Sequence, residues 1–218
     1  MKERPILFSG AMVRALLDGT KTQTRRVLKP APQMVTHNTI TTWDGTPAAL
    51  QHQLDRMGKG CTYGQPGDKL WVREAWGLHA YGDDTDWLKG GCSAMDLDDH
   101  VIAYRADWGP LQDSCHWRPS IHMPRAASRI ALEITSVRVE RLQDISESDA
   151  VAEGIEQMPC AVPDTRLWRN YDPGNGWTPS LAIPQNSFRS LWESINGHDS
   201  WDENPWVWVV EFPPPTTA

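Results

Sequence analysis

The stretch from residue 6 to residue 27 has the sequence ILFSGAMVRALLDGTKTQTRRV, and its pattern changes twice. Residues 6–8 form a short apolar run that is typical of a β-strand. Ser9 can cap the helix that follows, in which three apolar side chains share one face before Gly19 ends it. Residues 22–27 then alternate in the manner of a strand. The stretch therefore predicts a strand, a short helix and a second strand in close succession.

The same signals continue along the chain. Because the helices are too few and too short to cover both faces of a parallel sheet, we expect an α+β fold. Its centre would be a small mixed or antiparallel β-barrel, with a few short helices and long loop insertions. The further predicted elements are strands over residues 69–76, 129–139 (with a β-bulge near 135–136) and 206–212, and helices over 146–154 and 188–195.

Composition limits the class of protein. The 218 residues include 21 Lys and Arg against 28 Asp and Glu, which gives a net charge of −7. A chain of this length forms one core, or at most two small ones. No apolar run approaches the roughly 18 residues of a membrane span, and the start of the chain lacks an apolar secretory segment. We therefore expect a cytoplasmic protein that makes no membrane contact.

The cysteines are scattered without a CxxC pair, which fits reduced thiols better than a disulfide framework. A zinc site could be assembled on predicted insertions, but the spacing matches none of the close ligand pairs typical of zinc. We therefore expect no metal and no cofactor. The cysteines are Cys61, Cys92, Cys115 and Cys160, and the weighed zinc ligands are Cys92, Cys115, His116 and His122.

Charge is distributed unevenly along the chain. Residues 2–29 carry seven basic and two acidic side chains, a local balance of +5, whereas residues 83–113 contain eight Asp against one Lys and one Arg. The overall negative charge argues against tight binding to long duplexes, which depends on neutralising phosphates. A small or single-stranded ligand stays possible, and the 12 Trp offer flat faces for core packing or for stacking on bases.

The segment Gly19-Thr-Lys-Thr-Gln-Thr-Arg-Arg26 is the sharpest local signal. It differs from a phosphate loop, which needs a second Gly before the Gly-Lys pair and a helix after it. On a strand, Thr22, Thr24 and Arg26 point to one side, and Lys21 stands at the turn before them. Hydroxyl, ammonium and guanidinium groups would then converge. The alternative is a polar strand on a solvated face.

Four blocks occur in order along the chain: the helix with Gly-x-Lys-x-x-Thr-x-Arg up to Arg26, Gly67-Asp-x-Leu-x-Val-Arg-Glu74, residues 142–154, and the strand over 206–212. Together they resemble the ASCH superfamily, the activating-signal-cointegrator homology domains related to the PUA RNA-binding barrel. The run LWVREAW is similar to the longer, phage- and prophage-associated branch. The resemblance implies one ASCH-like domain over residues 1–212, with insertions at about 31–62, 77–117 and 156–185 and a disordered tail at 213–218.

This resemblance implies a pocket for a nucleoside or an RNA base. Some small bacterial members are amidohydrolases that remove the acyl group from N4-acetylcytidine and related N4-acylcytosines with a Lys, a Thr and a Glu. The family motif places these on Lys21 and Thr24, and on Glu153 in the helix after the long strand. Other members are credited with RNA binding or ribonuclease activity. We therefore expect an amidohydrolase of N4-acylcytosine nucleosides, with a non-catalytic module for single-stranded or modified RNA, or a phage-encoded ribonuclease, as alternatives.

Amide hydrolysis needs a nucleophile, a proton carrier and stabilisation of the oxyanion. Thr24 can attack if a neighbour takes its proton. Lys21 follows the C-terminal end of a helix, whose dipole favours the charged form, so it suits an oxyanion or orienting partner. It could take the proton only if burial lowers its pKa. Glu153 suits a proton shuttle to cytosine N4, or else it simply pairs with Lys21.

Arg26, Glu74 and Trp76 are further candidates for contact with the substrate. Glu74 should point inward on its strand and competes with Glu153 for the carboxylate role. Its structural alternative is a salt bridge to Arg26 or Arg129. Trp76 could stack on a base, and core packing is the alternative.

Overall fold

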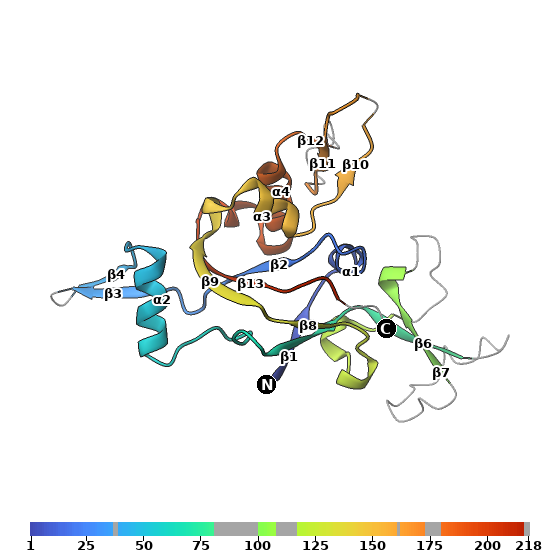
Figure 1. Ribbon diagram of the computed structural model, residues 1–218, viewed down its shortest axis with the longest axis horizontal. Coiled ribbons are helices and arrows are strands. Elements are labelled where there is room, and N and C mark those ends of the chain that lie inside the picture. The colour runs from blue at the N-terminus through green and yellow to red at the C-terminus, as the bar shows by residue number, and fades with distance from the viewer. Residues whose placement is uncertain (37–38, 81–99, 108–116, 161, 173–179, 216–218) are drawn as a thin grey trace.

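Two three-stranded sheets form the centre of the molecule (Figure 1). In the first, β5 (Lys69–Arg73) lies between β1 (Glu3–Leu7), which runs parallel to it, and the antiparallel β8 (Ala131–Glu133). In the second, β13 (Trp206–Glu211) lies between β2 (Gln23–Val27) and β9 (Ser136–Arg141), and both pairs are antiparallel. Both edges of the second sheet are therefore built from segments far apart in the sequence.

The structure is a computed structural model. It has the mixed α+β composition that the sequence predicts, with several small sheets and few helices. Within the part of the chain that it describes, the strand pairings do not close into a ring, and no helix is long and apolar enough to cross a membrane. The described residues are 1–36, 39–80, 100–107, 117–160, 162–172 and 180–215.

The chain passes from the first sheet to the second at Ile134 and Thr135. The Ile134 N–H donates to the Asp68 carbonyl and the Thr135 N–H donates to the Glu211 carbonyl, both at 2.9 Å. The sequence predicts one bulged strand over residues 129–139, and this is wrong in detail, because β8 and β9 belong to different sheets. The alternation of side chains changes here because the chain changes its partner strand.

The predicted strand over residues 69–76 is also divided. β5 ends at Arg73, and Trp76 begins β6 (Trp76–Ala80), which pairs with β7 (His100–Tyr104) in a separate sheet. At the break, the Glu74 N–H faces the sulfur of Met123 at 3.4 Å instead of a strand partner. Trp76 therefore leaves the central sheets and packs with a small satellite cluster.

Capping residues begin two of the helices as the sequence predicts. The Ser9 hydroxyl accepts from the Met12 N–H, and the Ser146 hydroxyl accepts from the Asp149 N–H. The helix predicted over 188–195 starts earlier, because Pro184 is suited to a first helical turn. The described α-helices are α1 (Gly10–Leu17), α2 (Pro47–Arg56), α3 (Glu147–Ala152) and α4 (Pro184–Asn196), with short 3₁₀ turns at Arg105–Asp107, Ser120–His122, Arg125–Ala127, Leu142–Asp144 and His198–Ser200.

The three segments predicted as insertions carry small sheets outside the central pair (Figure 1). The strands are β3 (Gln33–Thr36) with β4 (Thr39–Thr42), β6 with β7, and β10 (Gln157–Met158) with β11 (Leu167–Arg169) and β12 (Ser180–Leu181). Helix α2 lies next to β3 and β4, where the sequence predicts only a loop. Of the acidic segment 83–113, only residues 100–107 are described; of the predicted tail, 216–218 lie outside the described residues.

Two buried clusters lie on opposite faces of the second sheet. Trp208 and Val210 of β13 belong to a cluster with Phe8, α1 and the first sheet. Val207 and Val209 belong to a second cluster with α3 and α4. Since successive side chains of a strand point to opposite faces, β13 separates the two cores, and neighbouring β2 lies at the edge between them.

Candidate functional site

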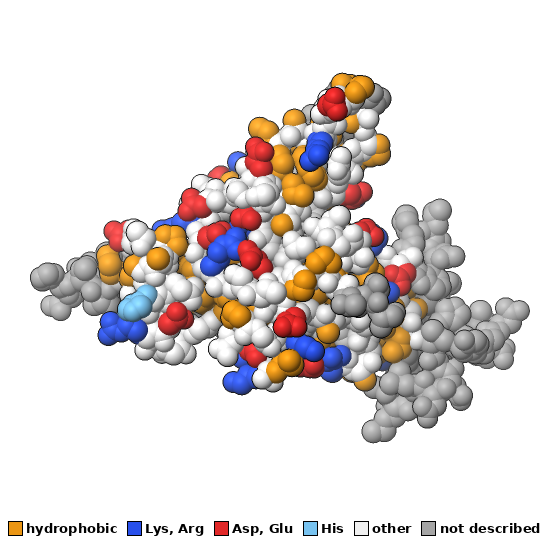
Figure 2. Space-filling model, in the orientation of Figure 1, with side chains coloured by type: hydrophobic (Ala, Val, Ile, Leu, Met, Phe, Trp, Pro, Cys, Tyr) orange, Lys and Arg blue, Asp and Glu red, His pale blue; other side chains and the backbone are white. Residues whose placement is uncertain are grey.

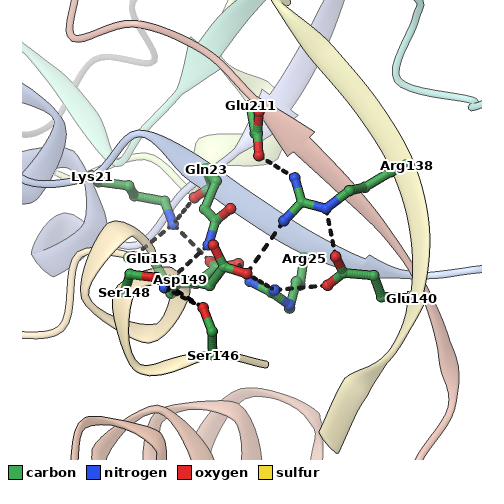
Figure 3. A network of polar contacts seen from close by, with 10 residues as sticks. All are labelled: Lys21, Gln23, Arg25, Arg138, Glu140, Ser146, Ser148, Asp149, Glu153 and Glu211. Carbon is green, nitrogen blue, oxygen red and sulfur yellow. Dashed lines mark hydrogen bonds and ion pairs between the residues drawn. The ribbon is translucent and has the colours of Figure 1, made fainter. Parts of the chain in front are cut away.

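Lys21 and Glu153 come from distant parts of the chain and meet at the start of β2. Their backbones form an antiparallel bridge, and Lys21 Nζ lies 3.1 Å from Glu153 Oε2 (Figure 3). Lys21 is 0% exposed and Glu153 is 2% exposed. The structure therefore brings two of the three residues implied by the ASCH resemblance into direct, buried contact.

Gly154 makes this approach possible. Its φ angle is +82°, in the left-handed region that favours glycine, and it ends α3. A Cβ at this position would lie 2.8 Å from the Cβ atoms of both Ala15 and Lys21. The missing side chain therefore lets the end of α3 pack against α1 and the turn before β2, which sets Glu153 beside Lys21.

The Lys21 ammonium group has three protein acceptors. Nζ donates to the Gln23 carbonyl at 2.8 Å, to the Glu153 carbonyl at 2.7 Å and to Glu153 Oε2 at 3.1 Å. Burial lowers the pKa of Lys21 from its ordinary value, although the Glu153 carboxylate opposes that change. The sequence predicts a charged Lys21 that is free to bind an oxyanion. In the structure its protons are instead directed at the protein, and burial favours the amine.

Arg25 holds the other oxygen of Glu153. Its Nη1 lies 3.2 Å from Glu153 Oε1, and its Nη2 lies 2.9 Å from Glu140 Oε2 and 3.0 Å from Asp149 Oδ2. The side chain is fully buried, so these charge-assisted bonds are shielded from water. Sequence reasoning did not assign Arg25 or Asp149 to this site. The alternation of β2, which sends Gln23 and Arg25 to the face opposite Thr24, is the signal that could have found them.

An outer layer of charges continues the network toward the surface. Arg138 pairs with Asp149 at 3.3 Å and also with Glu140 and Glu211. Figure 3 shows Arg138 and Glu140 on the side of Arg25 away from Lys21, and Figure 2 shows basic side chains flanked by acidic ones where β9 and α3 lie. The arrangement fixes the direction of the Arg25 guanidinium and, through it, the Glu153 carboxylate.

Thr24 and Arg26 lie on the other face of β2. Thr24 is 2% exposed and pairs with Val210 of β13, on the side of the first buried cluster. Arg26 Nη2 donates to the Leu7 carbonyl at 2.7 Å, and its guanidinium lies 5.3 Å from the centre of the Phe8 ring. Lys21 Nζ lies 5.4 Å from the same ring centre. Lys21 and Arg26 therefore both lie close to the Phe8 ring.

A small cavity connects Thr24 and Glu153. It has a volume of about 50 Å³ and lies between α4 and the edge of β2 that pairs with no described strand. Four consecutive strand residues line it because the strand edge, rather than one face, is turned toward it. Its lining is Met12, Thr24, Arg25, Arg26, Val27, Glu153, Phe188, Leu191, Trp192, Ile195 and Asn196.

Glu74 and Trp76 belong to a different region. Arg129 holds both Glu74 oxygens, at 2.9 and 3.0 Å, and also binds Asp107 at 2.6 Å. The Tyr104 ring covers the guanidinium at 3.9 Å. Trp76 is 2% exposed and packs in the satellite cluster. Each of these two side chains thus occupies the structural alternative weighed for it, and no described contact joins either to Lys21, Thr24 or Glu153.

A larger cavity lies elsewhere and lacks this chemistry. It has a volume of about 720 Å³ and is lined by α2, the end of β2 and Trp208. The ionisable side chains in its lining, Lys29 and Lys59, are exposed. We assign the candidate site by its buried charged groups rather than by size, since perturbed titratable groups mark functional sites.

The described residues contain no cluster of His, Cys, Asp and Glu that could hold a metal ion. Of the four side chains weighed as zinc ligands, Cys92, Cys115 and His116 lie outside the described residues.

Comparisons with known proteins give no relative for this chain. No protein-family model, no curated protein and no solved structure matches it.

Proposed function

We propose that this chain is an ASCH-type amidohydrolase that removes acyl groups from N4-acylated cytosine nucleosides, with its central strands arranged as a PUA-like barrel. The observation that carries the proposal is the buried contact between Lys21 and Glu153, beside a cavity that Thr24 also lines. The resemblance to the family assigns amide hydrolysis to these three residues, Lys21 and Thr24 through the Gly-x-Lys-x-x-Thr motif and Glu153 through its place after the long strand. The sheets β1-β5-β8 and β2-β13-β9 both contribute to the first buried cluster, which is compatible with a curled barrel wall.

The groups have the properties that the reaction requires. The Thr24 hydroxyl attacks the acyl carbonyl, forming an O–C bond, and its proton passes to Lys21, whose amine form burial favours. The proton then reaches cytosine N4 through Glu153 as the C–N bond breaks and the free amino group leaves. Water hydrolyses the acyl-threonine and regenerates the hydroxyl. Since catalytic contacts are often long before substrate binds, the Thr24 hydroxyl need not contact Nζ beforehand.

The test is hydrolysis of N4-acetylcytidine, followed by ultraviolet absorbance, by the wild type and by Glu153→Gln. Glu74→Gln is the matched control, because it removes the charge of a second buried glutamate outside the site. We expect cytidine release by the wild type, a loss of at least roughly a hundredfold in Glu153→Gln, and little change in folded Glu74→Gln. Intact substrate after hours with concentrated wild-type enzyme would overturn the proposal.

A second candidate is a module that binds RNA or a modified base without turnover. One observation favours it: all three Lys21 protons can already donate to protein acceptors, as in a purely structural ion pair. This alternative predicts salt-sensitive binding of single-stranded RNA that Arg26→Ala weakens, with no release of cytidine. The same protein preparations therefore separate the two candidates.

A further inference from the structure

The cavity beside β2 reaches the surface at one end. Most of its lining is buried, but Ile195 and Asn196 at the end of α4 are exposed. A ligand entering there would pass along the unpaired edge of β2 toward Thr24 and Glu153. The volume of about 50 Å³ is too small for a whole nucleoside, so only one end of such a ligand could enter.

The side chains of the lining carry N–H groups that have no acceptor among the described residues. These are Nε of Arg25, Nε of Arg26 and the indole Nε1 of Trp192. Arg25 and Trp192 are 4% and 5% exposed, so their donors are shielded from bulk water. An unpaired buried donor is costly, and the cost is relieved by a ligand that brings an acceptor.

The remaining wall is apolar. Phe188 and Leu191 of α4 are 3% and 7% exposed, and Val27 and Met12 face them from β2 and α1. A wall of hydrocarbon with several N–H donors matches a group that combines a carbonyl oxygen with a short alkyl part. An acyl group has this composition, whereas a hydroxyl-rich sugar does not.

The volume of the cavity limits which acyl groups can enter it. A cavity of about 50 Å³ holds one or two water-sized groups, since a water occupies roughly 30 Å³ in the liquid. A carbonyl with one methyl group fits this space. A benzoyl group, in which an aromatic ring replaces the methyl, exceeds it unless the α4 wall recedes.

We propose that this cavity is the acyl subsite of the enzyme and that α4 restricts it to acetyl-sized groups. The inference rests on the proposed amidohydrolase function and adds its substrate range. Leu191 and Phe188 set the size limit, and Trp192 Nε1 helps to hold the carbonyl oxygen. The cytosine and the sugar lie outside the cavity, toward Ile195 and Asn196.

The experiment compares N4-acetylcytidine with N4-benzoylcytidine in two assays, kcat/KM of the wild type and binding to Thr24→Val by calorimetry. Leu191→Ala shortens a side chain of the wall and so enlarges the cavity. Leu54→Ala on α2 is the matched control, since it removes the same atoms from an equally buried helix position, at 8% exposure. We expect the wild type to favour acetyl by at least about tenfold and Leu191→Ala to reduce that ratio about tenfold. Leu54→Ala should leave the ratio unchanged.

A second variant tests the carbonyl contact by removing one donor from the wall. Trp192→Phe removes the indole N–H but keeps an aromatic ring, and should lower kcat/KM for the acetyl substrate by roughly three- to tenfold. The ratio of kcat/KM for the two substrates is taken within one variant, so partial unfolding affects both values equally. The ratio therefore stays informative if Leu191→Ala is unstable.

The outcomes separate the two proposals. Turnover of both substrates with equal efficiency would leave the amidohydrolase standing and overturn the acyl subsite. Preferential binding of the acetyl compound to Thr24→Val, without turnover by the wild type, would support the subsite and overturn the enzyme. Neither binding nor turnover would overturn both.

Discussion

Glu153 and Glu74 are both buried carboxylates, each with an arginine on its oxygens, yet they lie in different surroundings. The Arg129 guanidinium donates to both Glu74 oxygens. It also binds Asp107, and the Tyr104 ring covers it. The oxygens of Glu153 are instead divided between Arg25 and Lys21, and a cavity lies alongside.

The difference shows why burial of a charge is weak support for a site. A two-pronged guanidinium pair occupies both oxygens of a carboxylate, as at Glu74, where no described pocket includes that residue in its lining. At Glu153 the cations differ in kind, and Lys21 is a group whose pKa burial can lower. We therefore expect changes around Glu74 to affect stability and changes around Glu153 to affect activity.

The largest effect should come from removing the Thr24 hydroxyl. Thr24→Val keeps the shape of the side chain, and kcat on N4-acetylcytidine should fall by roughly a thousandfold, because the nucleophile is lost. Thr22→Val is the control, since Thr22 directly precedes β2 and lies outside the cavity lining. Steady-state kinetics of the two variants check this, and equal activities would remove Thr24 from the reaction.

Breaking the ion pair between Glu74 and Arg129 should instead destabilise the fold. Arg129→Met leaves Glu74 buried without its fork, and we expect the free energy of unfolding to fall by about 3 kcal/mol in urea titrations. Adding Glu74→Gln to that variant should restore part of the loss. The activity of the folded fraction should stay within about twofold of wild type. A large fall in kcat of the folded protein would tie Glu74 to the site after all.

The two clusters should also respond oppositely to pH. The pKa of Lys21 is lowered by burial, so the folded state binds fewer protons than the unfolded state below 10.5, and stability rises with pH through that window. The pKa of Glu74 is raised by burial, so its contribution to stability falls as pH rises above 4.5. Each slope is at most about 1.4 kcal/mol per pH unit.

Unfolding titrations at several pH values check both signs. Lys21→Met should abolish the rise of stability with pH below 10.5 and leave the fall above 4.5 unchanged. Glu74→Gln should abolish the fall of stability above 4.5 and leave the alkaline rise unchanged. If Lys21 takes the Thr24 proton, kcat should also rise with pH at a value below 10.5. A flat alkaline profile for both stability and kcat would show that Lys21 stays an ammonium throughout.

The smallest effect should come from the outer layer. The Arg138 side chain is 33% exposed, so solvent weakens its three ion pairs. Arg138→Met should cost about 1 kcal/mol or less in urea unfolding, whereas Arg25→Met, at 0% side-chain exposure, should cost about 3 kcal/mol. Equal losses would mean that the network acts as one unit rather than as an inner and an outer layer.

The elements that the sequence predicted correctly are those whose signals lie within a few neighbouring residues. The caps at Ser9 and Ser146, the strand over 206–212 and the α+β class follow from side chains within a few residues of one another. The division at residues 134–135 was missed, because a change of alternation has the same pattern whether a strand bulges or joins another sheet.

By itself the sequence determined which chemical groups are available: a Lys and a Thr three residues apart, a Glu at the end of a later helix, and a second Glu after a strand. Tertiary structure decided what surrounds each of them. Glu153 meets Lys21 across 132 positions only because Gly154 lets α3 approach, and both Glu74 oxygens bind Arg129, which lies 55 positions away just before β8. Burial, acceptor geometry and the cavity under α4 are properties of these long-range contacts, which no local pattern encodes.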